Sequence, residues 1–334
     1  MDAVQQRIKE AKLYINKLSL LGINEIDIQI DKDEIVLKKY AMDKNGGSIV
    51  IPEFITCIER GAFSEVTSDL RIIYKGNWIK SMNYVFWGYC GKYIDLANFN
   101  VSSVEYMEGV FYGCIGLERV NLGEFNTANV RNMDHMFNGC ESLQELDISN
   151  FDTSSVGSMT SMFDDCSSLK QLNLSNFDTS RVRSMQSMFD GCWSLKELDI
   201  SNFDTSKVTN MNSLFSGCGS LKKLDLDNFN TSKVKDMRCM FNGCMSLQQL
   251  DLSNFDTSRV RSMQSMFEGC WSLKELNLSS FNSDNVKSTR NMFSECSSLQ
   301  QLDLGNFDTS KVEYTNGMFY KCKTDIGTIR LKNW

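Results

Sequence analysis

The chain has 334 residues, of which 42% are hydrophobic, so it carries enough apolar side chains for a large core and is not intrinsically disordered. Its formal net charge of −7 argues against a generally basic nucleic-acid-binding protein. The opening residues, MDAVQQRIKE, lack the regions of a signal peptide, and no apolar run approaches the ~18 residues that span a bilayer. Twelve cysteines without an export signal indicate a reducing compartment, so we expect a cytoplasmic protein. A surface location is the alternative if a leader has been trimmed.

The first 45 residues predict a cap made of a helix and a hairpin. Residues 3–22 have the amphipathic spacing of a helix. They are followed by EIDIQI and EIVLKKY, two alternating segments joined by the turn DKD. Residues 46–97 then contain IPEFITCIERGAF and WIKSMNYVFWGYCGKYIDLANF, which have the character of degenerate leucine-rich repeats.

From residue 98 to residue 323 the sequence predicts nine repeats with a period of 26 residues. One phenylalanine and one cysteine mark each repeat: Phe99, Phe125, Phe151, Phe177, Phe203, Phe229, Phe255, Phe281 and Phe307, and Cys114, Cys140, Cys166, Cys192, Cys218, Cys244, Cys270, Cys296 and Cys322. Residues 324–334 lose the pattern, and we expect them to form a C-terminal cap because the end of a repeat array has no neighbour to cover it.

Each repeat combines two periodicities. In VRSMQSMFDGC (residues 182–192) the apolar side chains fall at offsets 0, 3, 6, 7 and 10, which is the spacing of one helix face. In LKELDI (residues 195–200) the pattern is that of a strand. Parallel strands stack about 4.8 Å apart, whereas packed helices need about 8–10 Å, so an outer layer of helices would bend the array. We therefore expect an α/β repeat solenoid, a leucine-rich-repeat horseshoe with a parallel concave β-sheet and convex helices.

The repeats also resemble a known family. SIVIPEFITCIERGAF is similar to the Treponema-type leucine-rich repeat of BspA-like proteins, and NFDTSxVxxMxxMFxGCxSLKxLDLS resembles the Mycoplasma lipoprotein-associated repeat of the same broad family. The resemblance covers roughly residues 46–334. It implies a right-handed solenoid with an adhesion or protein-binding role, in a family whose usual members are bacterial surface proteins with leaders and anchors.

No pattern in the chain predicts catalysis, a cofactor or a metal site. The column cysteines recur without the paired ligands of a metal site, and we expect them to pack as small buried side chains. Cys239 lies outside the column and is the candidate for an exposed thiol. His135 occupies a variable position with no fixed nucleophile near it, and neither a phosphate-binding loop nor a zinc-protease motif occurs. We therefore expect a protein that is not an enzyme.

A column of Asp and Asn residues on the outward face of the expected strands is the first candidate for binding a partner. The acidic members that we assign to the site are Asp147, Asp199, Asp225, Asp251 and Asp303, with Glu197 beside them. Such a strip would attract a basic partner. A hydrated ridge inherited with the repeat is the alternative.

Trp193 and Trp271 are the second candidate, because they follow column cysteines at a variable position and tryptophan is a favoured interface anchor. Inheritance by duplication explains them equally well. Basic residues gather near the expected helix starts: Arg181, Arg183, Lys207, Lys233, Lys235, Arg238, Arg259, Arg261 and Lys287. Helix stability does not account for positive charge there, although solubility would.

These features favour a monomeric protein that binds another protein with a basic surface, using the acidic concave face or the Trp-bearing edge. Direct binding of nucleic acid or of a membrane is not expected. Two alternatives stay open: a bacterial surface adhesin or antigen whose leader is missing, and an inhibitor whose acidic strip mimics nucleic acid and blocks a nucleic-acid enzyme.

Overall fold

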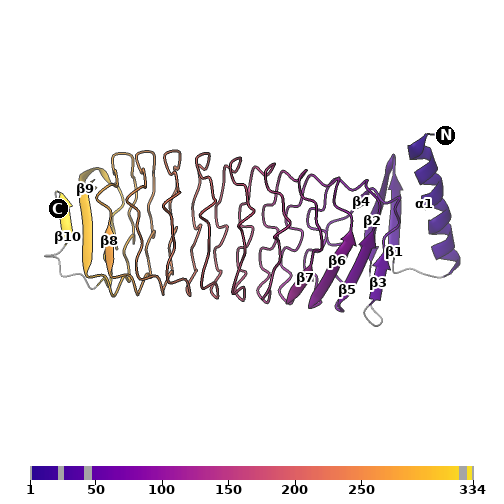
Figure 1. Ribbon diagram of the computed structural model, residues 1–334, viewed down its shortest axis with the longest axis horizontal. Coiled ribbons are helices and arrows are strands. Elements are labelled where there is room, and N and C mark those ends of the chain that lie inside the picture. The colour runs from indigo at the N-terminus through magenta and orange to yellow at the C-terminus, as the bar shows by residue number, and fades with distance from the viewer. Residues whose placement is uncertain (1, 22–25, 41–46, 323–328, 333–334) are drawn as a thin grey trace.

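The structure, a computed structural model, describes residues 2–21, 26–40, 47–322 and 329–332. The chain forms a β-solenoid of about 11 turns, which resembles leucine-rich-repeat proteins. Figure 1 shows the turns stacked side by side in an elongated molecule, with the N-terminal helix across one end and the last strands at the other. Each turn therefore contacts only the turns before and after it, as in other repeat proteins.

The N-terminal end is closed by a helix and a hairpin. Helix α1, Ala3–Leu20, lies within the expected residues 3–22, and the Asp2 side chain caps it by accepting the Gln5 N–H at 2.8 Å. Strands β1 (Ile26–Asp31) and β2 (Glu34–Tyr40) pair antiparallel, and β2 also pairs parallel with β4 (Cys57–Ile58). The hairpin thus joins the first turn of the solenoid.

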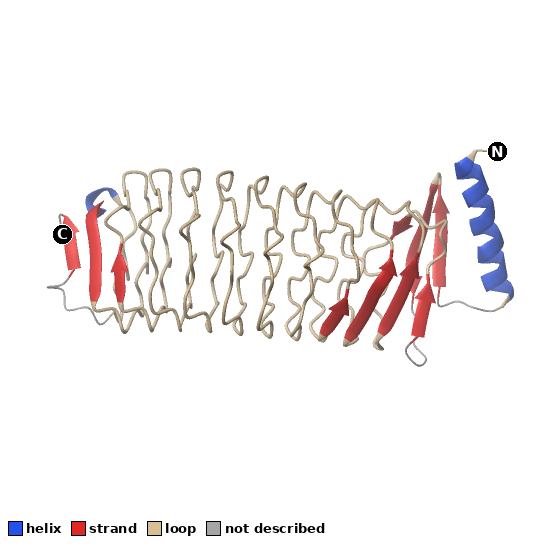
Figure 2. Ribbon diagram, in the orientation of Figure 1, coloured by secondary structure: helices blue, strands red, loops and turns tan. Residues whose placement is uncertain are grey.

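Parallel sheets occupy the two ends of the stack (Figure 2). At the N-terminal end they are β3 (Gly47–Val50), β5 (Leu70–Tyr74), β6 (Tyr93–Phe99) and β7 (Arg119–Asn121). At the C-terminal end they are β8 (Glu275–Asn277), β9 (Gln301–Asp308) and β10 (Ile329–Lys332), with the 3-10 turn η1 (Thr309–Lys311) after β9. Apart from β10, the expected C-terminal cap lies outside the described residues. The intervening repeats run extended on this side without a continuous strand ladder, so the expected continuous parallel sheet is found only in part.

The prediction of a layer of convex helices is wrong. Among the described residues that follow α1, the structure contains no α-helix, and the segment 182–192 is a series of tight turns. Its alternate N–H groups donate to the next repeat, for example Met185 to the Asn210 carbonyl at 3.2 Å and Phe189 to the Leu214 carbonyl at 3.1 Å. Ser187 has a φ of 52° and Gly191 a φ of 68°. A continuous right-handed helix excludes such residues, and the small side chains there permit the turns.

Because turns stack as closely as strands, the geometric reason for an arc disappears, and the horseshoe is not confirmed. On the turn side the ring centroids of Phe189 and Phe215 are 5.9 Å apart, and those of Phe215 and Phe241 are 5.8 Å apart. On the strand side the corresponding distance between Phe229 and Phe255 is 6.5 Å. The stacked phenylalanine rings of neighbouring turns are therefore somewhat closer together on the turn side than on the strand side.

Three buried side-chain ladders hold adjacent turns together. The column cysteines from 114 to 296 are free and buried, and each S–H reaches a phenylalanine carbonyl of the preceding turns, as Cys192 does with Phe163 at 3.2 Å. A corner threonine in most of the middle repeats bonds both the N–H and the carbonyl of the next repeat, as Thr205 does with Asn230. An asparagine donates back to carbonyls of the previous repeat, as Asn228 does to Phe203 at 2.7 Å. These bonds satisfy buried backbone groups where the strand ladder is interrupted.

Candidate partner-binding surfaces

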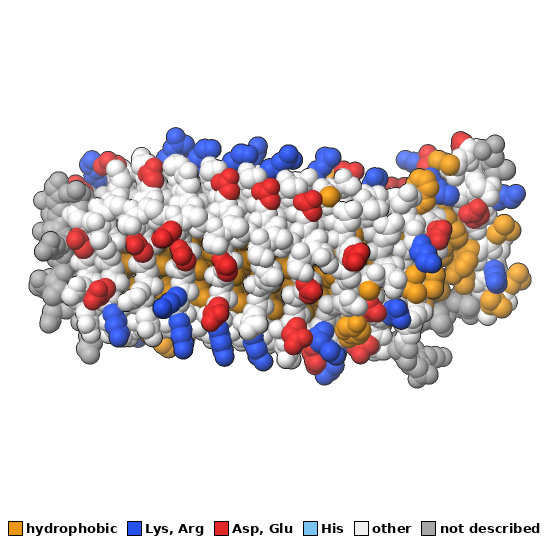
Figure 3. All heavy atoms as spheres, viewed as in Figure 1, with side chains coloured by type: hydrophobic (Ala, Val, Ile, Leu, Met, Phe, Trp, Pro, Cys, Tyr) orange, Lys and Arg blue, Asp and Glu red, His pale blue; other side chains and the backbone are white. Residues whose placement is uncertain are grey.

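An open groove of ≈ 1110 Å³ lies on the strand side, over the repeats that precede and include β8 and β9. Its floor consists of Leu224, Leu250, Leu276 and Leu302. Figure 3 shows this face, with hydrophobic side chains visible along the middle of the stack between rows of charged side chains. The wider spacing of the turns on the strand side is consistent with this partial exposure of the leucine row.

The predicted acidic column forms one wall of this groove. Asp225, Asp251 and Asp303 line it, and the intervening member of the column is Asn277. Asp147 and Asp199 lie in the same column on earlier turns and are exposed, beyond the lining of the groove.

The opposite wall belongs to the column of Glu197, which is chemically mixed. Lys223, Gln249, Glu275 and Gln301 line the groove there. Glu197 is itself exposed but lies one turn before the groove. The acidic character therefore comes mainly from the aspartate wall.

The aspartate column also has a structural role that the sequence analysis missed. Each member from 95 to 303 accepts a hydrogen bond from the backbone N–H two residues later, as Asp199 does from Ser201 at 3.1 Å and Asp251 from Ser253 at 2.9 Å. Asparagine makes the same turn, as Asn277 does with Ser279. The recurring pattern of Asp or Asn two residues before Ser or Gly is the signal that predicts it.

These hydrogen bonds orient the carboxylates, and they lower the pKa of three of them. Bonds from the Ser149 hydroxyl and N–H lower the pKa of Asp147, and bonds from Ser201 and Ser253, backbone first, lower the pKa of Asp199 and Asp251. Each carboxylate retains a further oxygen toward solvent. The column can therefore present fixed negative charge to a partner even though its residue type is explained by the turn.

Trp193 and Trp271 lie away from the groove and are 44% and 46% exposed. The Trp193 ring lies against the backbone of the next turn, since a Cβ on Gly219 would come within 2.8 Å of it and one on Gly217 within 3.5 Å. Part of its surface is thus used for packing. The structure does not bring the two tryptophans and the acidic column into one site.

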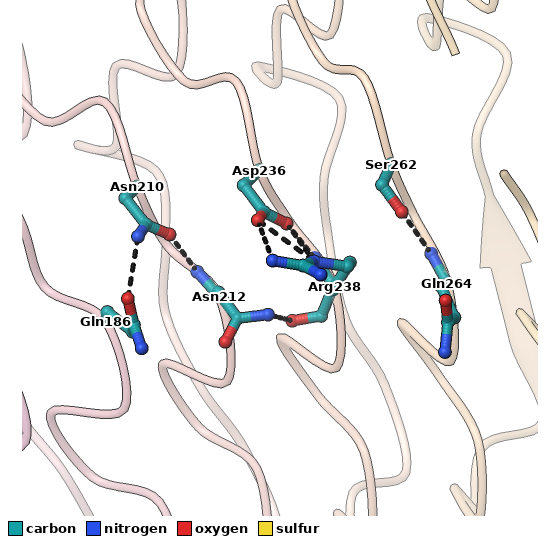
Figure 4. Close-up of polar contacts among 7 residues, drawn as sticks. All are labelled: Gln186, Asn210, Asn212, Asp236, Arg238, Ser262 and Gln264. Atoms are coloured by element: carbon teal, nitrogen blue, oxygen red, sulfur yellow. Dashed lines mark hydrogen bonds and ion pairs between the residues drawn. The ribbon is translucent and has the colours of Figure 1, made fainter. Parts of the chain in front are cut away.

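A polar row on the turn side is largely satisfied by its own contacts (Figure 4). Asn210 accepts the Asn212 N–H at 3.0 Å and donates to Gln186 at 2.9 Å. Arg238 forms a two-pronged ion pair with Asp236, with a shortest distance of 2.6 Å. These side chains vary between repeats, but they offer few unpaired groups to a partner.

His135 and Cys239 are not arranged for catalysis with each other or with a further nucleophile among the residues that the structure describes. Cys239 is half-buried rather than exposed, and burial raises the pKa of its thiol, so the prediction of an exposed reactive thiol is wrong. His135 is half-buried, with its ring edge-on to Tyr112. Within the described part of the chain, no group of three or more His, Cys, Asp or Glu side chains is placed to hold a metal ion.

Burial raises the pKa of the Asp164 carboxyl group to about 6. Burial is the main cause, and the nearby Asp190 and Asp165 add to it, while bonds from Ser161 and Asn138 oppose it. The folded state therefore holds its proton between about pH 4 and 6 where the unfolded chain does not, and stability falls as the pH rises through this window.

We expect Asp164→Asn to raise the free energy of unfolding at pH 7.5 by about 1 kcal/mol, a figure reduced for solvent screening, and to have little effect at pH 4. Asn138 and Asn242 occupy the same repeat position, so the amide is compatible with the fold. Thermal melts at both pH values measure the effect, with Asp147→Asn as the control. An unchanged pH profile in Asp164→Asn would contradict the assignment.

The geometry defines the class of protein as a leucine-rich-repeat-like β-solenoid. The chain belongs to the family described as "Mycoplasma protein of unknown function, DUF285", which matches residues 80–197, 169–274 and 248–334. This match confirms the resemblance to the Mycoplasma-type repeat. A comparison with curated proteins finds no match.

Two solved structures are similar to the chain. A leucine-rich cell surface protein from Faecalibacterium prausnitzii A2-165 is 16% identical, with a TM-score of 0.37 over 84% of this chain and 87% of that one. A leucine-rich-repeat protein from Eubacterium ventriosum ATCC 27560 is also 16% identical, with a TM-score of 0.37 over 86% of this chain and 78% of that one. Neither the comparisons nor the structure supports the expected cytoplasmic location. Among the described residues, no helix is long and apolar enough to cross a membrane.

Proposed function

We propose that the protein is a non-enzymatic scaffold that binds a protein partner with a basic surface in the strand-side groove. The observation that carries the proposal is the groove itself, in which a leucine floor lies beside the carboxylates of Asp225, Asp251 and Asp303. The carboxylates provide long-range attraction, whereas the floor leucines, which are 1–8% exposed, leave only a little apolar area to bury. Because the carboxylates are already held by backbone bonds, little side-chain entropy is lost on binding.

The test replaces Asp225, Asp251 and Asp303 together by asparagine, which keeps the backbone turns. Partners are captured from a lysate and from the intact surface of the native host, identified by mass spectrometry and purified for binding measurements. We expect the variant to bind at least about tenfold more weakly, mainly through a slower on-rate, with an unchanged or higher Tm. The two sources of partner distinguish an intracellular role from that of an adhesin.

The matched control is Asp178→Asn, Asp204→Asn, Asp256→Asn. It removes the same charge from a second column of carboxylates, which make the same kind of turn outside the groove. Full binding by the groove variant would overturn the proposal. If Trp193→Ser, Trp271→Ser then abolished binding, the site would be the tryptophan edge. The inhibitor hypothesis has no further support, since asparagine interrupts the acidic column at 121, 173 and 277.

A further inference from the structure

Exposed lysine and arginine side chains form two parallel rows along the edge where the strand side meets the turn side. We define this basic edge as Arg181, Lys207, Lys233 and Arg259 in one row, and Arg183, Lys235, Arg261 and Lys287 in the other. All eight are exposed. Figure 3 shows blue side chains projecting in a line along the upper edge of the stack.

The spacing of the second row is set by the backbone. Lys235 N–H donates to Thr209, Arg261 to Lys235 and Lys287 to Arg261, with distances of 2.8 to 2.9 Å. The next residue in each turn forms parallel bridges, from Ser184 through Asn210, Asp236 and Ser262 to Ser288. The backbone positions of successive turns are therefore about 4.8 Å apart here. Lys235, Arg261 and Lys287 follow one another at this spacing, whereas the uncharged Thr209 lies between Arg183 and Lys235.

Within the described chain, the charges of the basic edge are only partly compensated. None of the eight side chains forms an ion pair there, in contrast to Arg238, which is bound to Asp236. Three carboxylates, Asp178, Asp204 and Asp256, border the edge, and each accepts a backbone N–H of its own turn. Asp204 and Asp256 also attract the neighbouring cations of the edge, but three carboxylates leave an excess of positive charge among eight basic side chains. Like charges on adjacent rungs repel, so fold stability does not account for the rows.

The basic edge is also bounded. In the second row the corresponding residues near the two ends of the solenoid are Glu105 and Glu313. At its N-terminal limit a hollow of ≈ 490 Å³ is lined by Ser155, Gly157, Arg181, Arg183 and Lys207. The basic edge is thus a bounded, mainly positive strip in a chain whose net charge is −7. Such a strip is typical of a binding surface for an anionic partner.

We propose that the basic edge binds a linear sulfated polysaccharide, independently of the groove. Lysine offers point charge and arginine a fork that matches sulfate oxygens. Neither row contains an aromatic residue, so the platform on which single-stranded bases stack is missing. Neither row contains an apolar residue that could enter a bilayer. The phosphates of a duplex lie on two strands that wind around its axis, so the basic edge would contact them only at intervals. A single flexible polysaccharide chain can follow the basic edge along its length.

The test compares two full-length variants that lose the same charge. The edge variant is Arg183→Thr, Lys207→Ser, Lys233→Ser, Lys235→Thr, which uses residue types found at the same positions in other repeats. The control variant is Lys170→Gln, Lys196→Gln, Lys222→Gln, Lys274→Gln, from an exposed lysine column on the other border of the strand side. Thermal melts establish that both variants fold as the original protein does.

Binding is measured with heparin across a salt series, alongside desulfated heparin, duplex DNA and phosphatidylserine vesicles. We expect heparin to bind the original protein, the edge variant to bind at least about tenfold more weakly with a shallower salt dependence, and the control variant to stay within about twofold. The proposal would be overturned if both variants lost heparin affinity equally, or if the edge variant kept the affinity of the original protein. Binding of desulfated heparin as tight as that of heparin would also overturn it. Tighter binding of the duplex or of the vesicles through the same residues would likewise overturn it.

Discussion

Replacing Phe215 by alanine is expected to lower the free energy of unfolding by about 3–5 kcal/mol. The Phe215 side chain is fully buried. Its ring stacks between Phe189 and Phe241, with centroids 5.9 and 5.8 Å away, and Phe229 lies 6.4 Å away on the strand side. Removing the ring leaves a cavity that stacked neighbours on a hydrogen-bonded ladder cannot close.

The position of Phe215 near the middle of the stack makes a second consequence measurable. Because each turn contacts only its neighbours, a cavity there weakens the coupling between the two halves. Urea unfolding followed by circular dichroism should show a lower midpoint and a broader or two-step transition. Asp225→Asn in the same repeat is the control and should leave the curve unchanged, since Asn277 makes the same turn. A Phe215→Ala curve that coincides with the control would contradict the stacked core.

The inward-facing residues could be predicted from the sequence because burial in a solenoid depends only on which side chains point inward. Val182, Met185 and Phe189 are buried whether their segment is a helix or a series of turns. The backbone conformation could not be predicted in this way. Offsets of 3 and 4 between apolar residues fit both structures, and the deciding feature is the left-handed backbone at Ser187 and Gly191. Glycine recurs at the second of these positions, but a glycine there is equally compatible with the end of a helix.

For the candidate site, too, the direction of the side chains could be predicted from the sequence, but the groove could not. The outward direction of Asp199 and Asp225 follows from strand alternation and agrees with their exposure. The groove depends on how far adjacent turns separate on the strand side, which is a property of the whole stack rather than of one repeat. The hydrogen-bond ladders also join residues 25 to 29 positions apart, so they become visible only when the turns are superposed.

Replacing Thr205 by valine is expected to destabilise the protein by about 2–4 kcal/mol, although the two side chains have nearly the same shape. The Thr205 side chain is fully buried in the corner between turns. Its hydroxyl donates to the Asn230 carbonyl at 3.0 Å and accepts the Asn230 N–H at 2.7 Å. Valine removes both bonds and leaves a backbone donor and a backbone acceptor without partners in a dry environment.

Thr205→Ser is the matched control, because Ser283 occupies the equivalent position and makes the same pair of bonds with Asp308. The serine variant loses only a methyl group, so we expect a decrease of about 1 kcal/mol. Urea denaturation gives both values. Amide exchange at Asn230, followed by NMR or mass spectrometry, tests the mechanism directly, since this N–H should exchange faster in the valine variant alone. If valine proves as stable as serine and the Asn230 amide stays protected, the threonine ladder does not hold the turns together, and packing of the phenylalanine and methionine columns is sufficient.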